Sequence, residues 1–338
     1  SIKIKTLNLQ EKLSQSFKDL GSRLNGSESK SMRELRSRSF DYFKGQGFPT
    51  NQDEEWKYTS LNKIVKRDFD FSSQVSSEIL AKDIEPFLCE RLDSYKLIFI
   101  NGVFNKSLST LDSNEKFFVG SLKQGMKEMP EIIKAYYGKL ADTKQSLVAL
   151  NTAMADEGAF VYVKKGVKLD KLVQILFVNT NHEESRMMQT RNLFVLEDFA
   201  EAQIFERHQA FNQGHVFSNS VTESSVGNEA HFKHFKLQND LDSSSMVDST
   251  FVKQGANSSA LVDTFAFSGE LVRNNLHFEF TGMHAEAHMD AITLLKGKSL
   301  VDHHTFVDHA VANCQSNQLY KGIYDEKSKG VFNGKVMV

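Results

Sequence analysis

The sequence predicts a mainly β protein, in which a β-helix over residues 151–338 follows a mainly α-helical region over residues 1–150. Two observations predict this fold. Beyond Ala159, short apolar strands follow one another with no helical stretch between them, which argues against a βαβ architecture. Glycines also recur about every 14 residues, so two turns complete one coil of 27 or 28 residues. These glycines are Gly227, Gly255, Gly269, Gly282 and Gly297.

Many short strands at regular spacing would also fit a β-sandwich. The sustained period favours a solenoid, because apolar runs that recur at a fixed period can stack coil on coil into a continuous core. A left-handed hexapeptide solenoid is disfavoured, since no six-residue apolar repeat is visible.

The N-terminal region begins with two predicted helices. Apolar residues recur close to helical spacing over residues 6–24, and Asn25-Gly26 ends this segment. Ser31 and Glu34 have the spacing of a capping box, which predicts that the second helix starts there and stops before Pro49.

Three further elements are expected before the solenoid. The segment Asp53–Thr59 holds the only tryptophan and predicts a short helix or turn that anchors a loop on a hydrophobic base. Residues 95–108 predict a hairpin around Asn101-Gly102. Residues 120–157 look helical again, with Pro130 in a first helical turn.

The strands of the solenoid are expected from Ala159 onward, and residues 331–336 alternate in the manner of one more strand at the end. The expected strands are Ala159–Val163, Leu172–Val178, Arg191–Leu196, Gln203–Arg207, Ser218–Ser224, Ala230–Leu237, Ser259–Phe267, Arg273–Phe280, Ala285–Leu295 and His304–Val311.

Composition excludes several classes of protein. Lys and Arg number 41 against 43 Asp and Glu, so the chain lacks the basic footprint of a nucleic-acid binder. No run of about 18 apolar residues predicts a membrane span, and the first residues show no secretory signal. Cys89 and Cys314 lie far apart and form no C-x-x-C pair, which fits a reducing cytoplasm.

No sequence motif supports a hydrolase or a nucleotide-binding protein, because GxSxG, P-loop, HExxH and GxGxxG patterns are all missing from the sequence. On a strand, His284, Glu286 and His288 would share one face and could hold a divalent metal. A solvated sheet face is the favoured interpretation of these residues, because a metal site also needs convergent geometry.

The segment from Asp302 to His309 is the richest candidate site. Strand alternation places His303 and His309 on one face and His304 on the other, and the coil period brings His277 near His304. With Cys314 nearby, His303, His304 and His309 are candidate ligands for iron or a sulfur species. The alternative is a hydrogen-bonded histidine ladder that satisfies buried polar groups.

Several segments resemble the core signature of the SufB/SufD family, the scaffold subunits of the Suf iron–sulfur cluster assembly system. They are Leu271–Leu276, Val301–Thr305, Gln318–Ile323 and Lys329–Lys335. Asp53–Thr59 and Leu147–Gly158 resemble the SufD branch in particular, and the scarcity of cysteines also favours that branch. The resemblance covers nearly the whole chain.

The resemblance implies a right-handed parallel β-helix and a non-catalytic scaffold. It implies a SufB-like partner that meets this chain through the ends of the two β-helices, and a SufC-like ATPase bound through a C-terminal helical region. It also implies that a cluster forms in the complex, with none held stably on this chain alone, and that the chain can pair with itself when alone.

Family members continue past Lys335 with further coils, a C-x-H-G motif and the SufC-binding helices. We therefore expect this sequence to be a C-terminally truncated form. Its last strands would offer an unpaired edge to a partner. The candidate interface residues are Tyr320, Lys321, Phe332, Asn333 and Val336.

Two other functions fit a β-helix. One is a polysaccharide-active enzyme, which is disfavoured because the chain shows neither a secretion signal nor a cluster of aspartates on one face. The other is a structural protein that forms filaments.

Overall fold

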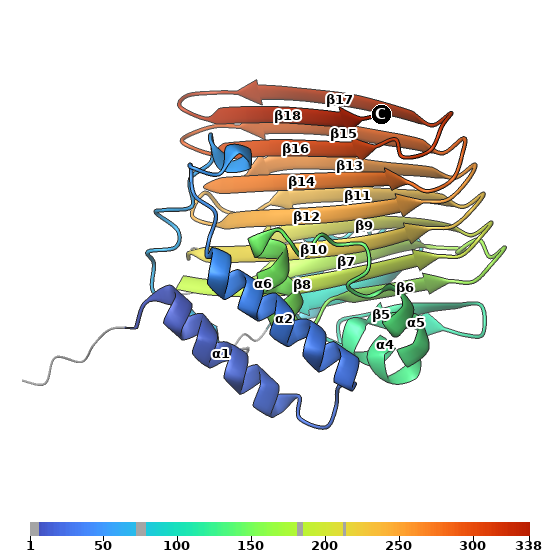
Figure 1. The fold of residues 1–338 in the computed structure, drawn as a ribbon, viewed down its shortest axis with the longest axis horizontal. Coiled ribbons are helices and arrows are strands. Elements are labelled where there is room, and N and C mark those ends of the chain that lie inside the picture. Colours follow the sequence, from blue (N-terminus) through green and yellow to red (C-terminus); the bar gives the residue numbers. More distant parts are fainter. Residues whose placement is uncertain (1–6, 72–78, 181–184, 212–213) are drawn as a thin grey trace, which may run out of the picture.

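The computed structural model describes residues 7–71, 79–180, 185–211 and 214–338. Two parallel sheets face each other and build a solenoid of about six turns (Figure 1). Each full coil contributes one strand to each sheet, so strands that are neighbours in a sheet are alternate strands of the sequence. The predicted mainly β class, the solenoid and the helical N-terminal region are confirmed.

The first sheet, sheet A, contains most even-numbered strands. Its order is β18 (Lys329–Met337), β16 (Leu300–Asp308), β14 (Leu271–Phe280), β12 (Ser245–Gln254), β10 (Val216–Val226), β8 (Ser185–Leu196), β6 (Ala159–Val163), β5 (Phe117–Ser121) and β4 (Asp112–Ser113), with β1 (Phe69–Asp70) beside β8. From β6 to β18 the strands pair in parallel, with long runs in constant register.

The second sheet, sheet B, closes the other side of each coil. Its order is β17 (Gln315–Tyr324), β15 (Glu286–Leu295), β13 (Ser259–Ser268), β11 (His231–Asn239), β9 (Glu201–Ala210), β7 (Leu172–Asn179), β2 (Ser94–Ile100) and β3 (Val103–Phe104). Its inward side chains stack from coil to coil, as Ala202, Phe232, Ala260 and Ala287 do.

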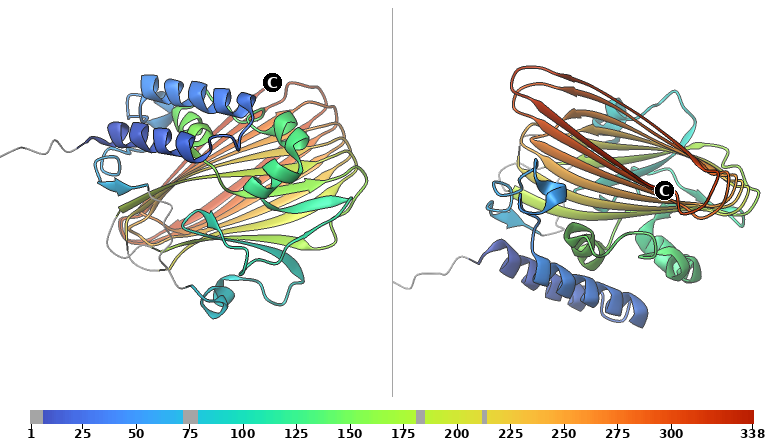
Figure 2. Two further views of the ribbon diagram at one scale, coloured as in Figure 1. Left: turned by 90° about the horizontal axis from the view of Figure 1, so that it is seen from below. Right: turned by 45° about the horizontal axis from the view of Figure 1, so that its top comes forward.

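The N-terminal helices cover the outer face of sheet A (Figure 2). Helix α6 (Ser146–Met154) lies directly on β8 and β10, and helix α2 (Lys30–Gln46) packs on α6, with α1 (Leu9–Arg23) beside them. Because α6 is enclosed between a sheet and a helix, every residue from Leu147 to Ala153 is buried. This explains why α6 lacks the polar face that a surface helix would show.

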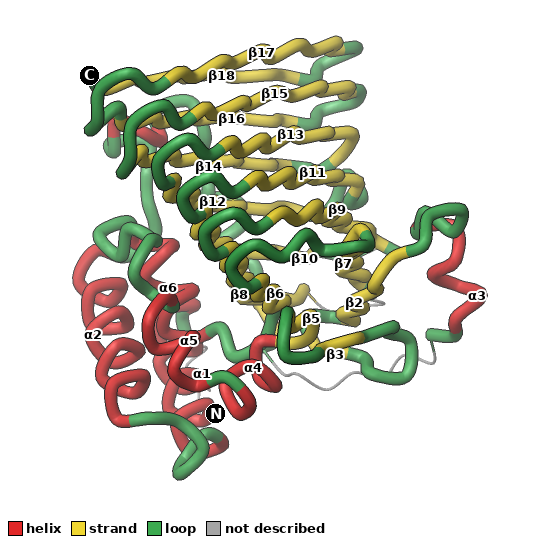
Figure 3. The backbone as a smooth tube through the Cα atoms, turned by 90° about the vertical axis from the view of Figure 1, so that its right-hand side faces the viewer, coloured by secondary structure: helices red, strands yellow, loops and turns green. Residues whose placement is uncertain are grey.

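The remaining helices lie at the base of the solenoid (Figure 3). They are α3 (Ala81–Ile84), α4 (Leu122–Glu128), α5 (Pro130–Tyr136) and a short 3₁₀ turn at Glu85–Phe87. A second 3₁₀ turn, Glu54–Trp56, lies instead against β14 and β16, where Trp56 packs on Arg273 and Glu55 contacts His304. None of the helices in the described part of the chain is long and apolar enough to cross a membrane.

The predicted hairpin is confirmed, with Asn101 at φ 51° and Gly102 at φ 77° in the tight turn between β2 and β3. Its first strand also joins sheet B by pairing in parallel with β7. The first helix and the 3₁₀ turn at Trp56 are confirmed as well. The division at residue 150 stays a prediction.

Three predictions about elements were wrong. The N-cap of α2 is Ser29, whose hydroxyl accepts from the Met32 amide, so the capping box at Ser31 does not form. The stretch predicted to be helical from residue 120 instead begins inside strand β5, because Phe117–Ser121 is buried in sheet A. The expected strands omit β12 and β17, which are rich in polar residues and lack an apolar run.

Candidate functional site

The five predicted interface residues all lie on β17 and β18, the last coil of the structure. Tyr320 points into the coil, where its ring centroid is 5.1 Å from His303 and 4.8 Å from Phe332. Phe332 and Val336 remain 51% and 50% exposed. Together these side chains line a groove of about 590 Å³ at the open end of the solenoid.

Both strands of this coil pair on one side only within the described residues, β17 with β15 and β18 with β16. Their other edges present backbone N–H and C=O groups in the spacing that another parallel strand would need. The last coil therefore combines half-exposed apolar side chains with unpaired backbone groups, and its role as an interface stays a prediction.

The candidate histidines do not converge on one point. His303 points into the solenoid, where Asn274 donates to Nδ1 at 3.3 Å and Thr293 Oγ1 lies 2.9 Å from Nε2. Burial lowers the pKa of His303 to about 4, so the ring is neutral at pH 7. This side chain behaves as a member of a buried hydrogen-bonded ladder.

The other two candidates have different partners. His304 lies on the outer face of sheet A, with Nε2 2.9 Å from Asp302 Oδ1 and Nδ1 3.3 Å from Glu55 Oε2. His309 Nε2 is 3.0 Å from Ser316 Oγ. No group of three or more His, Cys, Asp or Glu side chains in the described ranges could hold a metal ion. A metal-binding role for these histidines stays a prediction.

The coil period does bring His277 near His304, on the paired strands β14 and β16, where the two side chains interact electrostatically. They are not directly opposite, because His304 faces Asn275 and His277 faces Phe306. The expectation about His284 was wrong. His284 does not share a strand face with His288, because it occupies a turn at φ 62° and β15 begins only at Glu286. The coil period predicts correctly which strands are neighbours. The turns, however, shift the pairing of β14 with β16 by about two residues from the expected one.

A buried arginine anchors the Trp56 segment to sheet A. The Arg273 guanidinium lies 4.4 Å from the centre of the Trp56 ring and donates to Asp302 Oδ2 at 3.1 Å. Thr59 donates to the same carboxylate. Trp56 also packs against the apolar cluster between the helices and sheet A, as expected, so the segment rests on both a hydrophobic base and a charged side chain.

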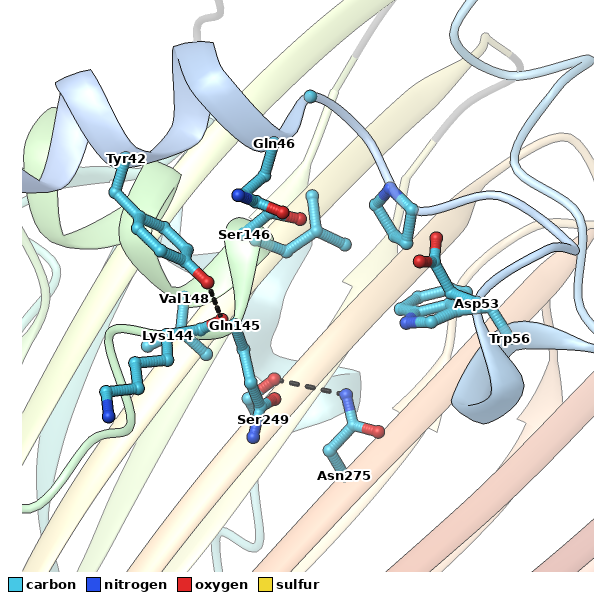
Figure 4. Close-up of a pocket in the computed structure, with 13 residues that line it drawn as sticks. Tyr42, Gln46, Asp53, Trp56, Lys144, Gln145, Ser146, Val148, Ser249 and Asn275 are labelled. Atoms are coloured by element: carbon cyan, nitrogen blue, oxygen red, sulfur yellow. Dashed lines mark hydrogen bonds between the residues drawn. The ribbon is translucent and has the colours of Figure 1, made fainter.

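A small pocket of about 190 Å³ opens beside this anchor (Figure 4). Trp56 and Asp53 form one wall, and the first turn of α6 forms the opposite wall with Lys144. Tyr42 donates to the Lys144 carbonyl at 2.5 Å, which fixes the segment that leads into α6. The lining residues come from three distant parts of the chain, residues 42–56, residues 144–148, and Ser249 with Asn275. No local spacing in the sequence could therefore have predicted the pocket.

A second buried arginine holds the segment between α5 and α6. Arg191 and Glu223 are fully buried on neighbouring strands, with Nη2 2.5 Å from Oε1. The guanidinium also lies 4.7 Å from the centre of the Tyr137 ring. Three backbone N–H groups also donate hydrogen bonds to the Glu223 carboxylate, those of Gly138, Leu140 and Ala141.

The interior of the solenoid contains a buried acid–base cluster that sequence reasoning missed. His208 and His234 each donate to Glu206, at 2.6 and 3.1 Å. Burial disfavours the charged carboxylate, but these hydrogen bonds hold the pKa of Glu206 well below its usual range. Lys236 Nζ lies 2.5 Å from Asp248 Oδ2.

This cluster continues toward the open groove. Gln238 donates to Asn274 at 2.6 Å, and Asn274 in turn contacts His303. A signal for it was present in the sequence, because Glu206 and His234 are 28 residues apart, close to the length of one coil. What the sequence did not reveal is which of these side chains point inward.

Comparison with known proteins covers almost the whole chain. A family profile described as the SufBD protein N-terminal region matches residues 7–175, and one described as the SUF system FeS cluster assembly SufBD core domain matches residues 177–338. The chain is 28% identical to an iron–sulfur cluster assembly SufBD family protein of Synechocystis, over 93% of this chain and 71% of the relative.

Two further relatives are more distant. The chain is 24% identical to the iron–sulfur cluster assembly protein SufD of Escherichia coli, over 86% of this chain and 66% of the relative. It is 25% identical to the chloroplastic protein ABCI7 of Arabidopsis thaliana, over 92% of this chain and 66% of the relative. The chain thus spans about two thirds of the length of these two relatives.

Proposed function

The chain belongs to the SufBD family of the SUF system for iron–sulfur cluster assembly, and on this basis we propose that it is a non-catalytic scaffold subunit of the SufD type. In this proposal it acts in the cytoplasm with a SufB-like subunit and a SufC-like ATPase. The cluster is the cargo of the complex and is not a resident cofactor of this chain.

The match of both SufBD family profiles is the observation that carries the proposal. The groove at β17 and β18 is the candidate contact surface for the SufB-like subunit, because Phe332 and Val336 supply half-exposed apolar side chains there. The rest of the molecule supports a rigid platform, since each coil is hydrogen-bonded to its neighbours and two buried arginines hold the N-terminal segments in place.

Co-purification with the SufB-like and SufC-like proteins of the same organism tests the proposal. Phe332→Glu should weaken retention of the SufB-like protein at least about tenfold, because it places a charge in the groove. Leu92→Glu is the matched control, since Leu92 is equally exposed, at 50%, but lies far from the last coil. Equal retention by both variants, or open-ended polymers in light scattering without binding, would contradict the proposal.

Anaerobic reconstitution of that complex tests the role of the histidines. With His303→Ala we expect an unchanged yield of cluster and a lower melting temperature, because His303 bonds to Asn274 and Thr293 inside the solenoid. A loss of cluster without a loss of stability would instead make this side chain a ligand.

A further inference from the structure

The outer face of sheet B carries apolar rows that no described segment covers. On β11, β13, β15 and β17 the outward side chains include Leu237, Phe265, Phe267, Ile292, Leu294 and Ile323. Ile292, Leu294 and Ile323 are 46%, 44% and 69% exposed. Ile292 has a neighbouring strand on both sides, so its exposure comes from the face of the sheet and not from its edge.

A parallel sheet normally has both faces covered. In this chain α6 and α2 cover the outer face of sheet A, whereas the described helices leave the outer face of β11 to β17 open (Figures 2 and 3). Contiguous apolar surface of this kind marks an interaction site on soluble proteins.

Two carboxylates stand beside the apolar rows. Asp263 and Asp290 occupy directly paired positions on β13 and β15, and both point outward. Neither forms a hydrogen bond or ion pair with any described residue, and the Oδ1 atom of Asp263 is fully buried without a donor. Burial and the neighbouring charge of Asp290 raise the pKa of Asp263. Like charges at paired positions destabilise a sheet unless a cation joins them.

We propose that this face binds an amphipathic helix of a partner protein, with the apolar side of the helix on the rows and an arginine or lysine between Asp263 and Asp290. Arginine suits the position best, because its planar donors can reach two carboxylates at once. The chain already covers the opposite sheet with helices, so the same kind of packing fits here. The surface differs from the groove of the last coil, and its occupant need not be the SufB-like subunit.

A peptide probe tests this inference on the chain as it stands. The probe is a fluorescent helical peptide of about 18 residues, or about 27 Å, with leucines along one face and arginines beside them. Anisotropy titration should show binding that weakens as salt rises, since the arginine contacts are electrostatic. A second peptide with glutamate in place of arginine should bind at least about tenfold more weakly.

Variants of the two aspartates locate the binding site. The double variant Asp263→Asn with Asp290→Asn should bind the arginine peptide at least about tenfold more weakly, which is equivalent to about 1.4 kcal/mol. The double variant Asp112→Asn with Glu115→Gln, two exposed acids of another hairpin, should leave binding unchanged. Both should remain folded, because the first removes a charge repulsion and the second alters solvated side chains.

Three results would overturn the inference. The first is equal binding of the two peptides or no binding of either, and the second is unchanged binding after the two aspartates are replaced. The third is a concentration-dependent dimer that Ile292→Asn abolishes in sedimentation, which would make a second copy of the chain the occupant.

Discussion

The buried pair Arg191–Glu223 allows a quantitative test of how the helical region is attached to the solenoid. Both side chains are 0% exposed, and Nη2 lies 2.5 Å from Oε1. Breaking such a pair by removing one partner leaves an uncompensated buried charge, which costs about 3–5 kcal/mol. We expect Arg191→Met to lose about 3 kcal/mol, because three backbone N–H groups still surround the carboxylate.

Glu223→Gln should cost more, about 4–5 kcal/mol, because it leaves the Arg191 cation without a counter-charge and turns amide hydrogens toward backbone donors. The double variant removes both charges. The double variant should therefore lose less free energy of unfolding than the two single variants lose together, by about 2 kcal/mol or more.

Urea unfolding followed by far-ultraviolet circular dichroism and by the fluorescence of Trp56, the only tryptophan, measures these values. The Trp56 signal reports the attached N-terminal segment, whereas circular dichroism is dominated by the strands. Additive losses, or a loss below about 1 kcal/mol for Arg191→Met, would refute the reasoning, because a buried pair must couple.

Three more predictions concern close packing and pH. Gly158→Ala should abolish soluble folded protein, since a Cβ atom would lie 1.6 Å from the Arg191 carbonyl oxygen, while Gly21→Ala, with open space around it in α1, should raise stability by about 0.5–1 kcal/mol in the same melting assay. Burial raises the pKa of Glu157 from 4.5 to about 7, so its contribution favours the folded state below pH 4.5 and is lost as pH rises to 7. Glu157→Gln should therefore gain roughly 3 kcal/mol over the parent above pH 7 and nothing below pH 4.5, and a pH-independent difference in urea titrations would argue against burial as the cause. For His303 burial lowers the pKa from 6.5 to about 4, so its contribution is complete above pH 6.5 and is lost as pH falls to 4. His303→Gln should flatten the acid side of the stability profile, and an unchanged profile would show that His303 is not buried in its neutral form.

Local patterns in the sequence were sufficient for most of the architecture. The Asn101-Gly102 turn was predictable because only a few residues adopt positive φ readily. The solenoid was predictable because turn glycines and apolar runs repeat with the length of one coil. Strand β12 was missed because Asp248 and Thr250 interrupt its apolar residues, and both are buried through contacts with Lys236 from the opposite sheet.

Some features of the candidate site were also predictable from the sequence, and others were not. Strand β18 and its half-exposed Phe332 followed from the alternation of residues 331–336, whereas β17, the other strand of the last coil, was missed. The separate positions of His303 and His304 also followed, since neighbouring residues on a strand point to opposite faces. The Arg191–Glu223 pair was not predicted, because sequence distance alone does not reveal which face of a strand a helix will cover.

The sequence therefore determined the repeat, and with it the class of fold and the family, since a coil period and turn chemistry are properties of neighbouring residues. Only the tertiary structure decided which polar side chains are buried and with which partners. Lys236 and Asp248 meet across the interior, and Trp56 meets Arg273 across 217 positions of the sequence. Burial in a solvent-free interior is what makes such pairs strong, and burial is a property of the folded whole.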